Sequence, residues 1–240
     1  HPDMFSRSVS VVDRGGVSVG AAPMGSGGDR VECVEEDPMP KIVVNAFLTL
    51  DGVMQAPGGP DEDRASGFPH GGWMSPYADD DLVMKNIGDA DGFLLGRKTY
   101  DIFAGYWPKI TDPKHPIAVP LNAKPKYVVS RTLDRVDWNN SSLVKGDVVA
   151  GLRKLREAPG RTVHTWGSTE LLQTLLAHDL VDEYRLFVFP VVLGTGKRLW
   201  AGGARPLALK QVEAVALSKG GTYCRLERGG KPTYGTVGAD

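Results

Sequence analysis

From Lys41 onward, short apolar runs alternate with segments of helical periodicity, and this alternation constrains the fold more than any other feature of the sequence. Five strands are expected, at residues 42–48, 93–95, 126–129, 162–165 and 184–192. Helices are expected from Pro76, over 97–103, from Asp147 and from Ser168. Two final strands, at 207–217 and 222–227, follow one another without a helix. This order predicts an α/β fold with a mainly parallel central sheet and an antiparallel C-terminal edge.

The composition excludes several classes of protein. With 41% hydrophobic and 24% charged residues, the 240-residue chain is not disordered throughout. A formal net charge of −1 gives no overall attraction for nucleic acid or for an anionic membrane. No apolar run approaches the ~20 residues of a membrane span, and no secretory signal is recognisable. We therefore expect a soluble, cytoplasmic protein without a nucleic-acid or membrane partner.

Cysteine and histidine give no indication of a metal site. Two cysteines, Cys33 and Cys224, supply neither a disulfide framework nor four thiolate ligands. The five histidines share no ligand spacing with one another or with cysteine. His164 lies in an expected strand, where a packed residue is more common than a catalyst. We interpret 139–142 as turn residues, because its glycosylation signals have no role without export.

The chain divides into three parts by composition. Residues 1–38 are rich in glycine and carry an acidic run, which predicts a flexible leader or an artificial extension upstream of the natural start. The alternative is that 9–12 and 17–19 form a hairpin. Residues 39–228 are expected to form one domain, followed by a tail at 229–240.

Several familiar nucleotide-binding and zinc-binding motifs are incomplete or absent in the sequence. The run Gly194-Thr195-Gly196-Lys197 resembles part of a phosphate loop, but it lacks the first glycine and the Ser or Thr after the lysine. No Gly-x-Gly-x-x-Gly lies between a strand and a helix, so the Rossmann fingerprint is absent. The zinc-deaminase signature is absent as well.

Three exits from expected strands remain as candidates for a ligand site. The first is Gly96-Arg97-Lys98-Thr99-Tyr100, the second Ser130-Arg131-Thr132, and the third Trp166-Gly167-Ser168-Thr169-Glu170. Each has a structural interpretation, as a turn, a solvated charge or a helix cap. Together they offer helix N-termini, a hydroxyl and a guanidinium at the carboxyl ends of strands, where open α/β sheets bind ligands. The combination favours a dinucleotide.

The same segments resemble the cofactor-binding segments of dihydrofolate reductase, in the same order. The run 181–186 and Pro190-Val191-Val192-Leu193-Gly194-Thr195-Gly196 resemble more closely the reductase domain of bacterial riboflavin biosynthesis and its stand-alone relatives, as does Thr49-Leu50-Asp51-Gly52. The similarity spans roughly residues 39–228. It implies a three-layer sandwich of the dihydrofolate-reductase type, NADPH as cofactor, a small-molecule substrate and a homodimer.

The resemblance also implies a role for each candidate residue. Pyrophosphate would meet Gly96, Arg97, Lys98 and Thr99, and Ser130 with Arg131 would meet the ribose 2′-phosphate. The phosphate on the nicotinamide side would meet Gly167, Ser168, Thr169 and Glu170. Beside the nicotinamide we expect Thr49, Asp51 and Gly52, with the 53–75 loop closing over it. Many relatives have Gly-Gly in place of Gly167-Ser168.

The catalytic acid is harder to place. The expected substrate-side helix carries Asp79, Asp80 and Asp81, of which helical spacing lets one or two face a cleft. Asp80 and Asp81 are our candidates, and a helix cap with solvated acids is the alternative.

We expect an NADPH-dependent reductase of a small heterocyclic or carbonyl substrate, with 5-amino-6-(5-phosphoribosylamino)uracil as the leading specific hypothesis. The alternatives are dihydrofolate reductase activity and a non-catalytic dinucleotide-binding protein.

Overall fold

The computed structural model describes residues 41–240 apart from 79, 158–161, 202–203 and 239–240, and the leader at 1–38 lies outside the described residues. The strands are β1 Ile42–Thr49, β2 Gly92–Gly96, β3 Lys126–Val129, β4 Ser141–Val144, β5 Val163–Trp166, β6 Glu183–Phe189, β7 Ala208–Ala216 and β8 Thr222–Gly230. The α-helices are α1 Asp80–Asp89, α2 Arg97–Tyr106, α3 Ala118–Ala123, α4 Val148–Glu157 and α5 Thr169–Ala177. Single 3₁₀ turns occur at Ala65–Gly67, Ser75–Tyr77 and Trp107–Lys109.

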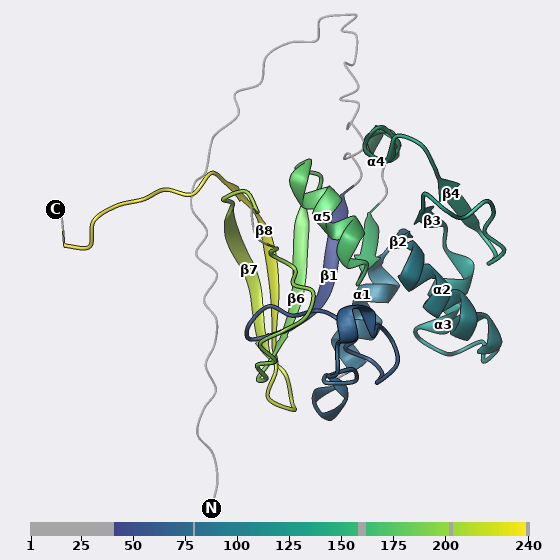
Figure 1. The fold of residues 1–240 in the computed structure, drawn as a ribbon, viewed down its shortest axis with the longest axis horizontal. Helices are drawn as coiled ribbons and strands as arrows, with labels where there is room; N and C mark the ends of the chain where they lie inside the picture. The colour runs from purple at the N-terminus through teal and green to yellow at the C-terminus, as the bar shows by residue number, and fades with distance from the viewer. Residues whose placement is uncertain (1–40, 79, 158–161, 202–203, 239–240) are drawn as a thin grey trace, which may run out of the picture. The chain divides into compact units, whose positions relative to one another are not determined.

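The described strands form one sheet in the order β4-β3-β2-β5-β1-β6-β8-β7 (Figure 1). All pairs from β4 to β6 are parallel, whereas β8 pairs antiparallel with both β6 and β7. The predicted parallel sheet with an antiparallel C-terminal edge is therefore confirmed. Because β2, β3 and β5 are parallel neighbours, their carboxyl ends lie along the same edge of the sheet.

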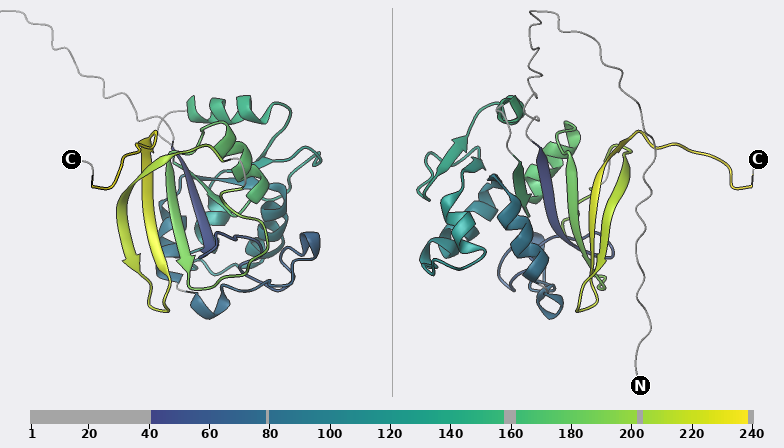
Figure 2. Two further views of the ribbon diagram at one scale, coloured as in Figure 1. Left: turned by 60° about the vertical axis from the view of Figure 1, so that its left-hand side comes forward. Right: turned by 180° about the vertical axis from the view of Figure 1, so that it is seen from behind.

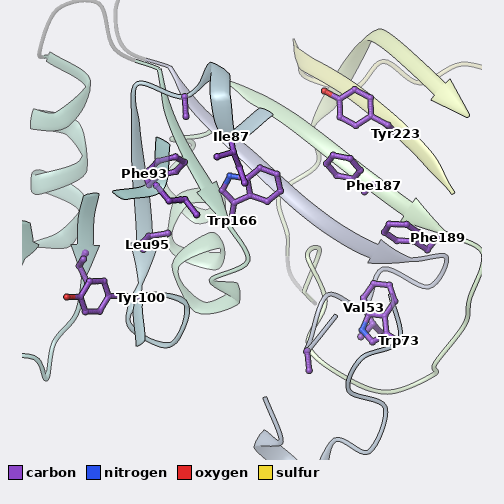
Figure 3. Packing of buried hydrophobic residues seen from close by; sticks show 14 of the residues in the cluster. Val53, Trp73, Ile87, Phe93, Leu95, Tyr100, Trp166, Phe187, Phe189 and Tyr223 are labelled. Atoms are coloured by element: carbon purple, nitrogen blue, oxygen red, sulfur yellow. The ribbon is translucent and has the colours of Figure 1, made fainter. Parts of the chain in front are cut away.

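Both faces of the sheet are covered by helices, which gives the three layers that the resemblance implied (Figure 2). Successive side chains of β2 point to opposite faces of the sheet and so belong to two separate cores. Phe93 and Leu95 face one core, and Leu94 faces the other. The first core packs against α1, α2 and α3 and is rich in aromatic rings (Figure 3). The second core is aliphatic and includes Leu152 of α4 with Leu171, Leu172 and Leu175 of α5.

Four local differences from the sequence predictions have simple causes. Ser141–Val144, half of which we interpreted as turn residues, forms the edge strand β4, whose weak apolar pattern reflects pairing on one side only. The short helix α3 was not predicted because Pro120 lies within it, in the first turn, where a proline is tolerated. Pro76 lies in a 3₁₀ turn, and α1 begins later, at Asp80. The strand predicted over 184–192 ends at Phe189, directly before Pro190.

His164 of β5 is fully buried under α1, as expected for a packed residue. Its Nδ1 lies 3.3 Å from Nδ2 of Asn45 on the neighbouring strand β1. Burial, with smaller contributions from the charges of Arg185 and Lys124, lowers the pKa of His164 to about 3. The imidazole is therefore neutral in the folded protein at physiological pH.

This burial predicts a pH dependence of stability. Because the pKa of His164 falls from its ordinary value of 6.5 to about 3 in the fold, the unfolded chain takes up the proton first as pH falls. His164 should then reduce the free energy of unfolding by up to about 1.4 kcal/mol per pH unit below about pH 6.5. Urea unfolding of the wild type and His164→Gln at several pH values measures this, and the variant should show the shallower slope. Parallel slopes would contradict the assignment.

Candidate functional site

A cleft of about 550 Å³ runs along the carboxyl ends of β2, β3 and β5. We call it the junction cleft, because the three strand exits line it together with residues of the 54–63 loop. The structure brings ten of the predicted site residues to this one cleft: Gly96, Arg97, Lys98, Thr99, Ser130, Arg131, Gly167, Ser168, Thr169 and Glu170. A hollow of about 880 Å³ between α2 and Trp138 holds none of the predicted site residues.

The hydroxyl of Ser168 joins the first and third exits. It accepts the backbone N–H of Gly96 at 2.9 Å and lies 2.9 Å from Oγ1 of Thr99. A Cβ on Gly96 would lie 3.2 Å from the side chain of Ser168, so glycine permits this close approach. The sequence predicted that Ser168 caps α5, but its side chain makes no capping bond and instead fixes the distance between the starts of α2 and α5.

Ser168 itself has a left-handed backbone, with φ 61° and ψ 52°. Gly167 before it also has positive φ, at 58°. This conformation suits glycine best, which gives a physical reason for the Gly-Gly that the family resemblance led us to expect here. In this chain, the hydroxyl contacts Gly96, Thr99 and the carbonyl of Trp166, and these hydrogen-bonding contacts offset the backbone strain.

Four cationic side chains line the junction cleft, and they differ in how they are paired. Arg97 contacts Asp101 at 3.4 Å and donates to Thr132. Lys98 and Lys197 both contact Asp63, at 3.0 Å and 2.7 Å. Within the described part of the chain, the exposed Arg131 has no ion-pair partner, so its guanidinium is available for an anion.

The backbone that carries Arg131 is held by Ser130. This side chain is buried, and its Oγ accepts the N–H groups of Thr132 at 3.2 Å and Leu133 at 3.0 Å. A serine hydroxyl that accepts these bonds can also donate its proton to a ligand. The second exit thus combines a fixed turn with a free cation.

Thr49, Asp51 and Gly52, which we expected beside the nicotinamide, do not line the junction cleft. The Asp51 carboxylate accepts the Thr49 hydroxyl at 2.6 Å, the N–H of Gly194 at 2.8 Å, and Nη2 of Arg198 at 3.1 Å. The Thr49 hydrogen bond, followed by those from the 193–198 segment, outweighs burial and holds the pKa of Asp51 well below its usual range. In this structure the turn fastens the end of β1 to the segment after β6.

A second cavity, of about 630 Å³, adjoins the junction cleft. We call it the apolar cavity, because aliphatic and aromatic side chains make up most of its wall. Trp166 lies in this wall with Ile87 (Figure 3). The two spaces share six lining residues: Phe47, Pro57, Glu62, Ile102, Phe103 and Trp166. The cleft and the cavity therefore lie next to each other, with side chains that belong to both walls.

The structure does not bring Asp81 to either space, since its side chain is exposed and α1 instead contributes Val83 and Ile87 to the cavity. Asp80 is the first residue of α1, and its side chain lies outside the described residues. Sequence reasoning missed Glu62, a half-buried carboxyl where the two spaces meet. Burial raises the pKa of Glu62 despite hydrogen bonds from the N–H groups of Gly58 and Gly59.

The described residues contain no helix long and apolar enough to cross a membrane. They also contain no group of three or more His, Cys, Asp or Glu side chains arranged to hold a metal ion.

Comparisons with solved structures agree with this architecture. Dihydrofolate reductase from Enterococcus faecalis, solved with NADP(H), shares 12% identity with a TM-score of 0.52 over 80% of this chain and 99% of its own. A deaminase/5-amino-6-(5-phosphoribosylamino)uracil reductase from Thermotoga maritima shares 16% identity with a TM-score of 0.53 over 79% of this chain and 57% of its own. At these identities the likeness shows the fold alone, which is of the dihydrofolate-reductase type.

Sequence comparison is more specific. The chain is 30% identical to the uncharacterized protein YyaP of Bacillus subtilis (strain 168) over 183 residues, which are 75% of this chain and 90% of the relative. The family model of the RibD C-terminal domain matches residues 40–223. The chain therefore belongs to the RibD C-terminal domain family.

Proposed function

We propose that this protein is a reductase that binds NADPH in the junction cleft and reduces a small molecule held in the apolar cavity. One observation carries the proposal. Three strand exits line a single cleft that adjoins an apolar cavity, and one of them carries Arg131, which has no ion-pair partner among the described residues. Membership of the RibD C-terminal domain family supports a reductase, and the neighbour solved with NADP(H) supports the cofactor.

The residues of the junction cleft fit a dinucleotide phosphate. Gly96 and Gly167 let the starts of α2 and α5 pack closely against Ser168 and Thr99, and the N-termini of these two helices offer N–H groups to a ligand. Arg131 with the Ser130 hydroxyl would hold the 2′-phosphate, and Arg97, Lys98 and Thr99 the pyrophosphate. The carboxylate of Glu170 suits a ribose hydroxyl better than a phosphate, because like charges repel. When bound, NADPH supplies a hydride, and Phe47 and Trp166 in the shared wall exclude water from the transfer.

Glu62 is our candidate for the proton donor. Reduction of a polar double bond consumes one hydride and one proton, so an acid must reach the substrate. Glu62 lines both the cleft and the cavity, and burial favours its protonated form. The alternative donors at Asp80 and Asp81 stay a prediction of the sequence, although Asp81 is exposed and lines neither space.

Substitution of Arg131 by alanine should change the cofactor preference. A guanidinium–phosphate contact is worth ~1.5–3 kcal/mol, so Arg131→Ala should bind NADPH roughly 10- to 100-fold more weakly. NADH binding should stay nearly constant, since NADH lacks this phosphate. Fluorescence titration of both cofactors measures the two affinities, and the difference should shrink as salt rises.

The matched control is Arg135→Ala, an exposed arginine of the same loop that does not line the junction cleft. It should leave both affinities unchanged. Equal losses of NADPH and NADH binding in Arg131→Ala would mean that Arg131 supports the fold and does not contact the phosphate.

Substitution of Glu62 by glutamine should slow reduction without weakening cofactor binding. Loss of a general acid typically costs ~10²–10⁴ in rate. Single-turnover NADPH oxidation, with any compound that the wild type reduces, measures the rate. Glu157→Gln, the same change at the exposed end of α4, is the control. A wild-type rate in Glu62→Gln would reject Glu62 as the donor.

Two alternatives to this function make different predictions. A dihydrofolate reductase would oxidise NADPH with dihydrofolate, and a non-catalytic binding protein would bind NADPH without turnover of any compound in a substrate panel. The activity named for the Thermotoga maritima protein is the first specific reaction to assay. The homodimer, the cytoplasmic location and the absence of a nucleic-acid partner stay predictions.

A further inference from the structure

The wall of the apolar cavity is built largely from aromatic rings. Five of these rings come from three strands and from α2 with the turn after it: Phe47 of β1, Phe103 of α2, Trp107 after α2, Trp166 of β5 and Phe189 of β6. Rings of this kind stack on flat ligands and bury a large apolar area. A volume of about 630 Å³ also lies in the range of pockets that enclose small organic molecules.

The charges of the cavity differ sharply from those of the junction cleft. Among the described residues that line the cavity, there is no lysine, arginine or histidine, whereas Arg97, Lys98, Arg131 and Lys197 line the cleft. The carboxyl groups at the cavity belong to Asp61 and Glu62. Asp61 forms an exposed ion pair with Arg64, whereas within the described ranges the hydrogen bonds to Glu62 come from the backbone N–H groups of Gly58 and Gly59.

An anionic ligand in the cavity would therefore lose its water without gaining a cation, and Glu62 in its ionised form would repel it. A buried charge without a partner is strongly unfavourable. An uncharged ring has no such cost and gains the contacts of the aromatic wall.

We propose that the apolar cavity binds an uncharged aromatic or heteroaromatic substrate that carries no phosphate. This inference rests on the proposed function, because the cavity is the space from which a substrate reaches the cofactor in the cleft. It separates the substrate from the phosphoribosyl compound named for the Thermotoga maritima protein, although the two chains share a fold. In this proposal, the cationic side chains that would bind phosphate groups lie in the junction cleft, and they bind the phosphates of the cofactor.

The test uses a pair of probes that differ by one phosphate, 1-naphthol and 1-naphthyl phosphate. Isothermal titration calorimetry of the full chain measures the binding of each probe. The variant Val83→Trp places a large side chain in the cavity wall, and Lys85→Trp makes the same change on the exposed face of α1. Binding that Val83→Trp abolishes and Lys85→Trp preserves belongs to the cavity; binding that neither variant changes belongs elsewhere.

Cavity binding of 1-naphthol should be at least about tenfold tighter than that of its phosphate. Equal or tighter cavity binding of the phosphate, or no cavity binding of 1-naphthol, would overturn the inference. If Val83→Trp fails to fold, Ala78→Arg is the second test, because it places a guanidinium in the cavity wall. The affinity for 1-naphthyl phosphate should then rise about tenfold or more, and the affinity for 1-naphthol should change by a few-fold at most. No gain for the phosphate would then contradict it.

NADPH titration of the same samples separates this inference from the proposed function. Normal NADPH binding with the wrong probe preference rejects only the substrate class. If the wild type does not bind NADPH, the proposed function is rejected. The probe measurements then still show which class of molecule the apolar cavity binds.

Discussion

The parallel pairing of β2 with β3 and β5 is the constraint on which the site depends. It brings three strand exits to one edge of the sheet, although they are separated by many residues in the chain. The Ser168 hydroxyl then ties two of these exits together through Gly96 and Thr99. The resulting cleft presents N–H groups at two helix N-termini, together with the guanidinium of Arg131, which has no ion-pair partner among the described residues.

The candidate site consists of two adjoining spaces that differ in the polarity of their walls. Cations line the junction cleft, while rings and aliphatic side chains line the apolar cavity. Phe47 and Trp166 belong to both walls, so under the proposed function they would shield the cofactor and the substrate from water where the two meet. Glu62 is a carboxyl at this boundary, and burial raises its pKa.

The three strand exits could be predicted from the sequence because each has a local pattern. In each, a buried apolar run is followed by glycine, serine or a cationic residue. The sequence was insufficient where distant segments supply the contact. Lys197 and Glu62 reach the site from loops whose course depends on tertiary packing. Asp51 matched a family turn, but its carboxylate bonds a segment more than 140 residues away, which no local pattern reveals. The edge strand β4 was missed because pairing, and not apolar periodicity, defines it.

The most direct test of the proposed cofactor site in the junction cleft is amide hydrogen exchange with and without NADP⁺. A ligand that binds the folded state slows exchange where it covers or orders backbone N–H groups. Protection should appear at 96–99, 130–132 and 167–170. Protection confined to other segments would contradict the assignment of the cofactor to the three strand exits.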